Sequence, residues 1–258
     1  MTILTFANWI AQAPGWILSL PQGLQRLIFQ FYQVFIFENR WKFFTDGLVT
    51  TFVVTIGALI LGIVIGMVVA LIRSTHDSIQ EKPNFLLKLL NSICKIYVTV
   101  LRGTPLMVQL LIMGFVVMVP KTTFDTNVCA IVTLGINSGA YVAEIARSGI
   151  MSINQGQMEA GRSLGLNYFQ TMFYIILPQA FKNILPALGN ELIALLKETS
   201  LVTVIALQDV TKAAQVIVSK AYTAVIPYIS LAAIYLILVM ILTKLLAILE
   251  RRLRKSER

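Results

Sequence analysis

Residues 48–72 read LVTTFVVTIGALILGIVIGMVVALI, an apolar stretch of 25 residues with no charged side chain. A helix needs about 20 mostly apolar residues to cross the roughly 30 Å hydrocarbon core of a bilayer. Backbone groups inside that core must find hydrogen-bond partners within the protein, and an α-helix satisfies them within one segment. This stretch therefore predicts a membrane-spanning helix.

Other stretches have the length and apolar character of a span, namely Ile96–Val119, Asn127–Ile150 and Tyr222–Leu249. A fifth, from about Pro178 to Leu196, is interrupted by proline and glycine. Such interruptions survive in membranes where neighbouring helices or water satisfy the freed backbone groups. The expected fold class is therefore all-α, a polytopic membrane helical bundle of about five transmembrane helices, with the fifth inside the bundle rather than facing lipid.

The composition supports a membrane location. Hydrophobic residues make up 57% of the 258 residues and charged residues only 13%, whereas soluble domains carry about 25% charged residues. The net charge of +9 raises the alternative of nucleic-acid binding, but the basic residues lie between apolar stretches and at the C-terminus, as in membrane proteins. Cys94 and Cys129 lack metal-ligand or CxxC spacing, so we interpret them as buried structural thiols and expect no metal site.

Residues 1–46 are less regular. Their apolar segments are Leu27–Phe37, which has 11 residues, and Phe6–Leu20, which Pro14 and Gly15 break. Short apolar segments rich in Trp, Tyr and Phe are typical of helices that lie in the membrane interface. We therefore predict an interfacial or extracytoplasmic segment at 1–46, with a sixth span as the alternative.

Lys and Arg are divided unevenly between the two sides of such a bundle. Among the segments that follow the first span, twelve lie on the side of the C-terminus and four on the other, so the positive-inside rule places the C-terminus in the cytoplasm. We predict a transmembrane domain at 47–253 and a cytoplasmic tail at 254–258. Five spans are too few to enclose a pathway alone, so we expect a dimer. The twelve are Arg73, Lys82, Lys88, Lys95, Arg147, Arg162, Lys244, Arg251, Arg252, Arg254, Lys255 and Arg258, and the four are Lys121, Lys197, Lys212 and Lys220.

The segment after the third long stretch reads GQMEAGRSLGLNYFQTMFYIILPQAF from Gly156. Small or apolar residues (Met158, Ala160, Gly161, Leu164 and Gly165) would form one face of a short helix at about 156–168. Small side chains let the backbone of another protein approach closely, so this face is typical of a docking helix. Gly165 is expected to end that helix in the left-handed conformation.

This segment resembles the EAA loop of bacterial ATP-binding-cassette importer permeases. The match consists of Glu159, Ala160 and Gly161, then Gly165, and then IILP at 175–178. Alanine is usual at the third position, and glycine there weakens helix propensity by about 1 kcal/mol. Three further stretches resemble the polar amino acid branch of the type I importers: LRGTPLMVQLL (101–111), SGAYVAEIARSGI (138–150) and LPALGNELIALLKETSLVTVI (185–205).

The resemblance implies a type I importer permease in the bacterial inner membrane, with residues 156–168 as the coupling helix that docks on an ATPase. It implies several partners: a dimer of ATPase subunits, a second permease subunit that is the same chain or a paralogue, and an extracytoplasmic amino-acid-binding protein. It also implies that this chain carries no cofactor, because ATP and Mg²⁺ bind the ATPase subunits. Consistently, the sequence contains no GxxxxGK[ST] loop.

Polar residues inside the apolar stretches are candidates for the substrate pathway. Ionisable groups at membrane depth are costly and usually mark a pathway or an internal pair. Asn137, Tyr141 and Glu144 are spaced i, i+4, i+7 and therefore share one helical face. With Asn190 and Glu191 they form the predicted pathway. The alternatives are that Glu144 pairs with Arg147, one turn further on, and that Lys197 and Glu198 lie in water at the outer interface.

Two other functions compete with ATP-driven import. An ion-coupled secondary transporter would normally show internal repeats with discontinuous helices in matching halves, and no repeat is visible in this sequence. A membrane enzyme, such as an intramembrane protease, would need a histidine or paired-aspartate constellation, and the candidates here are His76 and Asp77 in a polar loop. We therefore expect a transport subunit that is not itself an enzyme.

Overall fold

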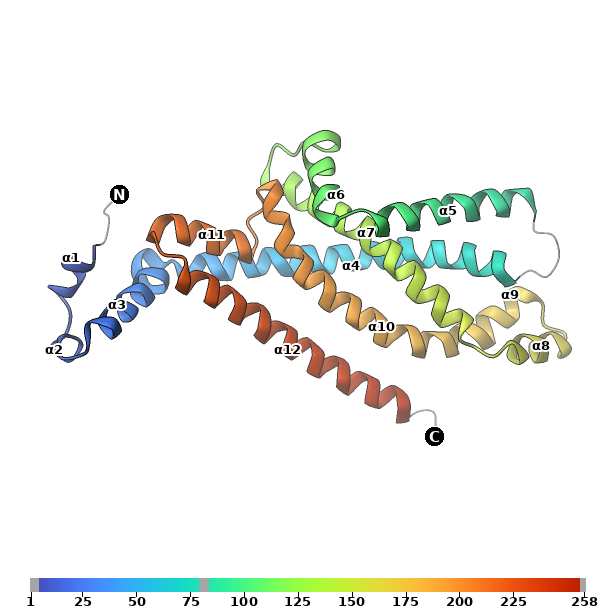
Figure 1. Cartoon of the computed structure of the whole chain (residues 1–258). Helices are drawn as coiled ribbons and strands as arrows, with labels where there is room; N and C mark the ends of the chain where they lie inside the picture. The colour runs from blue at the N-terminus through green and yellow to red at the C-terminus, as the bar shows by residue number, and fades with distance from the viewer. Residues whose placement is uncertain (1–4, 79–83, 256–258) are drawn as a thin grey trace. The chain divides into compact units, whose positions relative to one another are not determined.

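A computed structural model of the chain describes residues 5–78 and 84–255, which form helices joined by short turns and contain no strand (Figure 1). Lys82 and residues 256–258, which belong to the predicted cytoplasmic loop and tail, lie outside the described residues. The chain divides into two compact units, residues 1–51 with 208–238 and residues 52–207 with 239–258. Two long helices, α4 (Trp41–Ser78) and α12 (Val225–Lys255), run through both units.

The first unit contains short helices that precede α4. They are α1 (Phe6–Ile10), α2 (Gly15–Leu18), α3 (Gln22–Phe31), a π-helical turn η1 (Tyr32–Ile36) and a 3-10 turn η2 (Phe37–Asn39). Pro14 and Pro21 precede α2 and α3, where a missing N–H costs nothing because the first helical N–H groups have no intrahelical partner. The unit also holds α11 (Val210–Ala221), whose Ala214 and Ile217 form a core with Val34 and Phe44.

The second unit is built around α7 (Thr123–Met151). Within its most apolar window 61% of residues are buried, against 33% for α4 and 6% for α12. A capping box formed by Thr122 and Asp125 starts this helix. The other elements of the unit are α5 (Phe85–Gly103), α6 (Leu106–Ile112), η3 (Met113–Val117), α8 (Gln155–Ser163), α9 (Tyr168–Thr171), η4 (Met172–Ile176), α10 (Leu177–Glu198) and η5 (Thr199–Ile205).

Glycines let α4 and α7 approach closely. A Cβ at Gly66 of α4 would lie 2.6 Å from Val142 of α7, and one at Gly139 of α7 would lie 3.1 Å from Ile65 of α4. Small residues four apart are the usual means by which membrane helices pack, because lipid offers no hydrophobic driving force between them. Gly62 and Gly135 complete the two glycine pairs.

Three of the expected spans are confirmed as continuous helices, namely α4, α7 and α12. The expected second span, Ile96–Val119, is wrong as a single helix: α5 begins earlier, at Phe85, and bends by 105° into α6. The segment from Tyr168 to Ile205 joins α11 through a 50° bend. By length and composition, residues 5–78 and 84–255 thus contain three helices able to span a membrane, or up to five spans if each bent pair is one.

The N-terminal segment contains no helix long enough to cross a membrane among residues 5–40. This finding disfavours the sixth span, whereas the interfacial location stays a prediction. Helix α4 begins at Trp41, so the predicted boundary between residues 46 and 47 falls inside a helix. The two cysteines are confirmed as buried free thiols.

Candidate functional site

The predicted docking helix is α8, and it is shorter than the expected 156–168. The Asn154 side chain caps its N-terminus by accepting a hydrogen bond from Gly156 N at 2.8 Å. Gly165 has φ +85° and ends the helix as predicted. Leu166 N donates to Gly161 O at 3.2 Å and Gly165 N donates to Arg162 O at 3.0 Å, which together form a Schellman motif.

The sequence suggested that the small residues of this segment share one outward face. The structure shows that they do not. Gly161 is buried, and a Cβ there would meet Thr171 Cγ2 at 2.5 Å and Ile175 Cδ1 at 3.0 Å. Met158 packs inward with the same cluster, which includes Met172 and Ile176. Gly161 is therefore small because α8 lies against η4 and α9 of its own chain.

The outward face of α8 carries Glu159 and Ala160, both exposed. Beyond the helix end, Leu164 is 81% exposed and Phe169 is 74% exposed. Large apolar side chains this exposed beside a short polar helix are typical of a protein-binding surface. We define the docking surface as Glu159, Ala160, Leu164 and Phe169.

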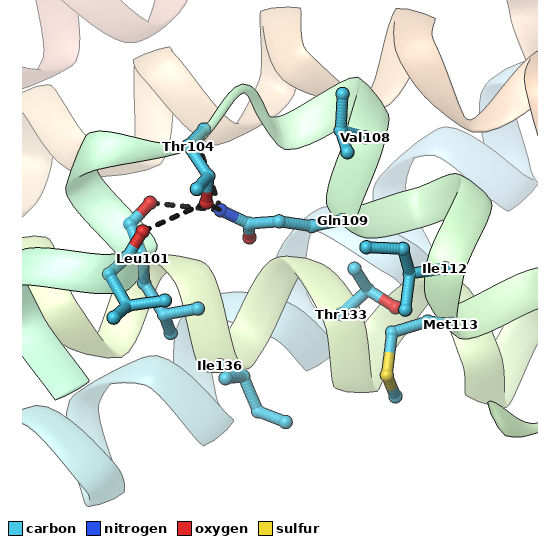
Figure 2. A pocket seen from close by; sticks show the side chains of 9 residues that line it. Leu101, Thr104, Val108, Gln109, Ile112, Met113, Thr133 and Ile136 are labelled. Atoms are coloured by element: carbon cyan, nitrogen blue, oxygen red, sulfur yellow. Dashed lines mark hydrogen bonds between the residues drawn. The ribbon is translucent and has the colours of Figure 1, made fainter.

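A second site lies at the break between α5 and α6. Pro105 has no N–H, so it cannot donate to Leu101 O as a continuing helix would. The side chain of Gln109 replaces that donor: its Nε2 donates to Leu101 O at 2.9 Å and to Thr104 Oγ1 at 2.9 Å (Figure 2). Its Oε1 accepts from Asn137 Nδ2 at 2.9 Å, which ties the break to α7.

Beside this break lies a half-open cavity of about 260 Å³. Figure 2 shows the Gln109 side chain reaching across it towards Thr104. The amide hydrogen bonds are used within the chain, so the cavity offers a mainly aliphatic wall. It is lined by Val100, Leu101, Thr104, Val108, Gln109, Ile112, Met113, Thr133 and Ile136.

A cation and an anion lie near the same break. Arg102, at the end of α5, places its guanidinium carbon 5.0 Å from the centre of the Tyr141 ring. Glu191 of α10 accepts a hydrogen bond from Ser138 Oγ at 2.7 Å. Arg102 is close enough to Glu191 for their charges to interact, yet neither forms a salt bridge within the described part of the chain.

Glu144 has different neighbours from the rest of the predicted pathway. It forms an ion pair with Arg73 of α4 and another with Arg147 at 3.1 Å, one turn further along α7. Arg147 also reaches Asp77 at 3.5 Å. Glu144 is therefore part of a charge cluster that joins α4 to α7, and the pairing with Arg147 considered as the alternative is present.

The structure brings together Asn137, Tyr141 and Glu191 of the predicted pathway and leaves Asn190 apart. Asn190 is exposed and its amide donates to Pro186 O at 3.2 Å, on the preceding turn of α10. Sequence reasoning missed Gln109 and Ser138 and gave Arg102 no role. The available signal was Pro105, because a proline within an apolar stretch frees a carbonyl that some side chain must satisfy.

Comparisons with known proteins identify the class. Residues 62–255 match the family described as "Binding-protein-dependent transport system inner membrane component", and the chain belongs to this family. The chain is thus an importer permease subunit with the type I permease fold.

Its relatives are amino acid transport proteins. It is 39% identical to the arginine transport system permease protein ArtQ of Bacillus subtilis (strain 168) over 217 residues, 83% of this chain and 94% of the relative. It is 35% identical to the glutamine transport system permease protein GlnP of Escherichia coli (strain K12) over 211 residues, which are 81% of this chain and 92% of the relative. A solved chain described as "Crystal structure of an amino acid ABC transporter with histidines" is 40% identical, with a TM-score of 0.72, over 82% of this chain and 94% of that chain.

Proposed function

We propose that this chain carries a polar amino acid across the cytoplasmic membrane, driven by ATP hydrolysis on separate ATPase subunits. The observation that carries the substrate class is the opposite charge of Arg102 and Glu191 at the α5–α6 break, without a salt bridge to either among the described residues. A free amino acid bears one carboxylate and one ammonium, which such a pair complements. The relatives named for arginine and glutamine support the same class.

In this proposal the Arg102 guanidinium binds the substrate carboxylate while the Tyr141 ring holds the guanidinium in place. Glu191 faces the substrate ammonium, and Ser138 orients the carboxylate by donating to it. Asn137 acts through Gln109, because its amide nitrogen donates to Gln109 Oε1 and to Leu101 O at the break rather than to open space. The substrate side chain is left to other residues.

The energy source lies on other chains. We propose that two ATPase subunits bind ATP and Mg²⁺ and contact the docking surface, and that a second permease subunit, the same chain or a paralogue, completes the pathway. The family description supports delivery of substrate by a binding protein. The excess of Lys and Arg on one side of the bundle supports a cytoplasmic location for the C-terminus. The same excess supports a cytoplasmic location for the docking surface.

The test is transport by the purified complex in liposomes. Glu191→Gln keeps the side-chain volume and removes the charge, so substrate uptake should fall at least tenfold while ATPase subunits still co-purify. Asp46→Asn is the matched control, because it makes the same change at an exposed position in the first unit. Uptake that continues without ATP in an ion gradient would favour a secondary transporter and overturn the proposal.

A further inference from the structure

Helix α3 presents an apolar face that the rest of the first unit leaves half exposed. Leu24, Leu27 and Phe31 follow one another at i, i+3 and i+7 and are 47%, 51% and 53% exposed. Ile28, which is partly buried, lies between them on the same face. We define Leu24, Leu27, Ile28 and Phe31 as the α3 stripe.

The opposite side of α3 is turned towards the chain. Phe29 is 9% exposed and follows Leu27 by two residues, which places it about 200° further round the helix. Its ring packs on Phe6 and Trp9, with ring centres 5.5 and 5.4 Å away. Arg26, the charged residue of α3, lies three residues before Phe29 and therefore on the same side. The side of α3 that carries its charge thus faces the chain, and its apolar side faces away.

This orientation is the reverse of that found in a water-soluble protein. There, an amphipathic helix packs its apolar face on the core and leaves its polar face in water. Large exposed apolar patches are rare on soluble monomers and mark contacts with other molecules. The α3 stripe therefore requires an apolar neighbour outside the chain, either lipid or protein.

The elements packed beside α3 favour lipid. Val34 of η1, which continues α3, shares a core with Phe44 of α4, and Ile226 of α12 packs against that core. Both α4 and α12 are long and apolar enough to span a membrane. Their own outward residues in this unit are exposed as the stripe is, with Val49 at 64% and Ile229 at 61%. The stripe is therefore attached to helix ends that already meet lipid.

Aromatic rings join the stripe to α4. The ring centres of Phe31 and Phe35 are 4.7 Å apart, and those of Phe35 and Phe44 are 5.7 Å apart. Helix α3 has 10 residues and η1 has 5, which together rise about 20 Å and fall short of the roughly 30 Å hydrocarbon core. A stripe that runs along a helix meets a flat surface when the helix axis lies parallel to that surface.

We propose that the α3 stripe binds the surface of the lipid bilayer. The axis of α3 lies parallel to the membrane plane, the stripe enters the boundary between headgroups and acyl chains, and the side that carries Arg26 points away from the acyl chains. The sequence predicts an interfacial location for residues 1–46 as a whole, whereas the structure assigns the contact to one face of one helix. Because η1 packs on α4, this contact also fixes the depth of α4 in the bilayer.

Spin labels on the full-length chain in liposomes test the contact. Cys94 and Cys129 are first replaced by alanine, and one label is then attached through Leu27→Cys or, on the opposite and exposed side, through Gln22→Cys. Oxygen concentrates among acyl chains, whereas a nickel chelate stays in water. For a stripe that enters the boundary by about 5–10 Å, the ratio of oxygen to nickel accessibility should be about fivefold higher at position 27 than at position 22.

Two outcomes of this measurement would overturn the proposal. Equal nickel accessibility at positions 27 and 22 would place the stripe in water. Exclusion of both reagents at position 27 would place it against protein, such as a second copy of this chain.

A triple variant provides a readout that needs no label. Leu24→Gln, Leu27→Gln and Phe31→Gln together remove the apolar face, so amide exchange of residues 22–36 in liposomes should rise at least tenfold, since burial of three large apolar side chains is lost. The matched control, Leu24→Met, Leu27→Met and Phe31→Leu, keeps the face apolar and should exchange like the unmodified chain. Equal exchange in the two triple variants would contradict a lipid contact at this face.

Discussion

Replacing Gly161 by alanine tests which way the docking helix faces. The new Cβ would lie 2.5 Å from Thr171 Cγ2 and 2.9 Å from Thr171 Oγ1, and Thr171 is buried. Overpacking of this kind costs about 1–3 kcal/mol, while alanine recovers about 0.5–1 kcal/mol as the better helix former. We expect a net loss of about 1 kcal/mol in the contact between α8 and its own chain, so α8 should open about fivefold more often.

The assay is amide hydrogen exchange of residues 155–171 in the chain purified without ATPase subunits. Gly161→Ala should raise the exchange rate about fivefold, since exchange reports local opening. Adding Thr171→Ser should restore most of the protection, because serine lacks the clashing methyl but keeps the hydroxyl that donates to Asn167 O at 3.0 Å. Ala160→Leu, at an exposed position, should leave exchange unchanged and weaken ATPase binding instead.

One result would refute this reasoning. If Gly161→Ala leaves exchange of the isolated chain unchanged but abolishes co-purification of the ATPase, then Gly161 contacts the partner directly. The inward orientation of that residue would then be wrong, and the original interpretation of a small-residue docking face would stand.

Three further predictions concern other parts of the second unit. Glu144→Gln removes both ion pairs of Glu144, so it should lower the Tm by a few degrees and reduce the ATPase response to substrate. An unchanged Tm would exclude a role for the charge cluster in holding α4 to α7. Gln109→Leu should raise the substrate KM at least tenfold, because Leu101 O loses the shorter of its two side-chain hydrogen bonds at the break and Asn137 loses its acceptor. Gln109→Glu should rescue little, since a carboxylate cannot donate; full activity of both variants would refute the positioning role. A single cysteine in place of Arg162 should resist an impermeant thiol reagent in intact cells, whereas one in place of Asp125 should react, and the opposite pattern would reverse the predicted orientation.

Much of the architecture follows from the sequence, because it rests on local properties. The helices α4, α7 and α12 follow from apolar length alone, since only a helix satisfies its own backbone in lipid. The end of α8 at Gly165 follows equally, because a left-handed residue after a helix favours glycine. The family was identifiable from the EAG motif at 159–161 and the spacing to IILP at 175–178.

Tertiary structure alone decided which neighbours these residues meet. Asn137 and Glu144 share a helical face, but they lie about 10 Å apart along the axis, so one meets Gln109 and the other Arg73. Gly161 has the same small side chain whether it faces an ATPase or Thr171, so only the packing of α8 on its own chain distinguishes the two. Helical periodicity specifies which residues share a face. Their contacts depend on which element covers that face, and residues far apart in the sequence determine which element that is.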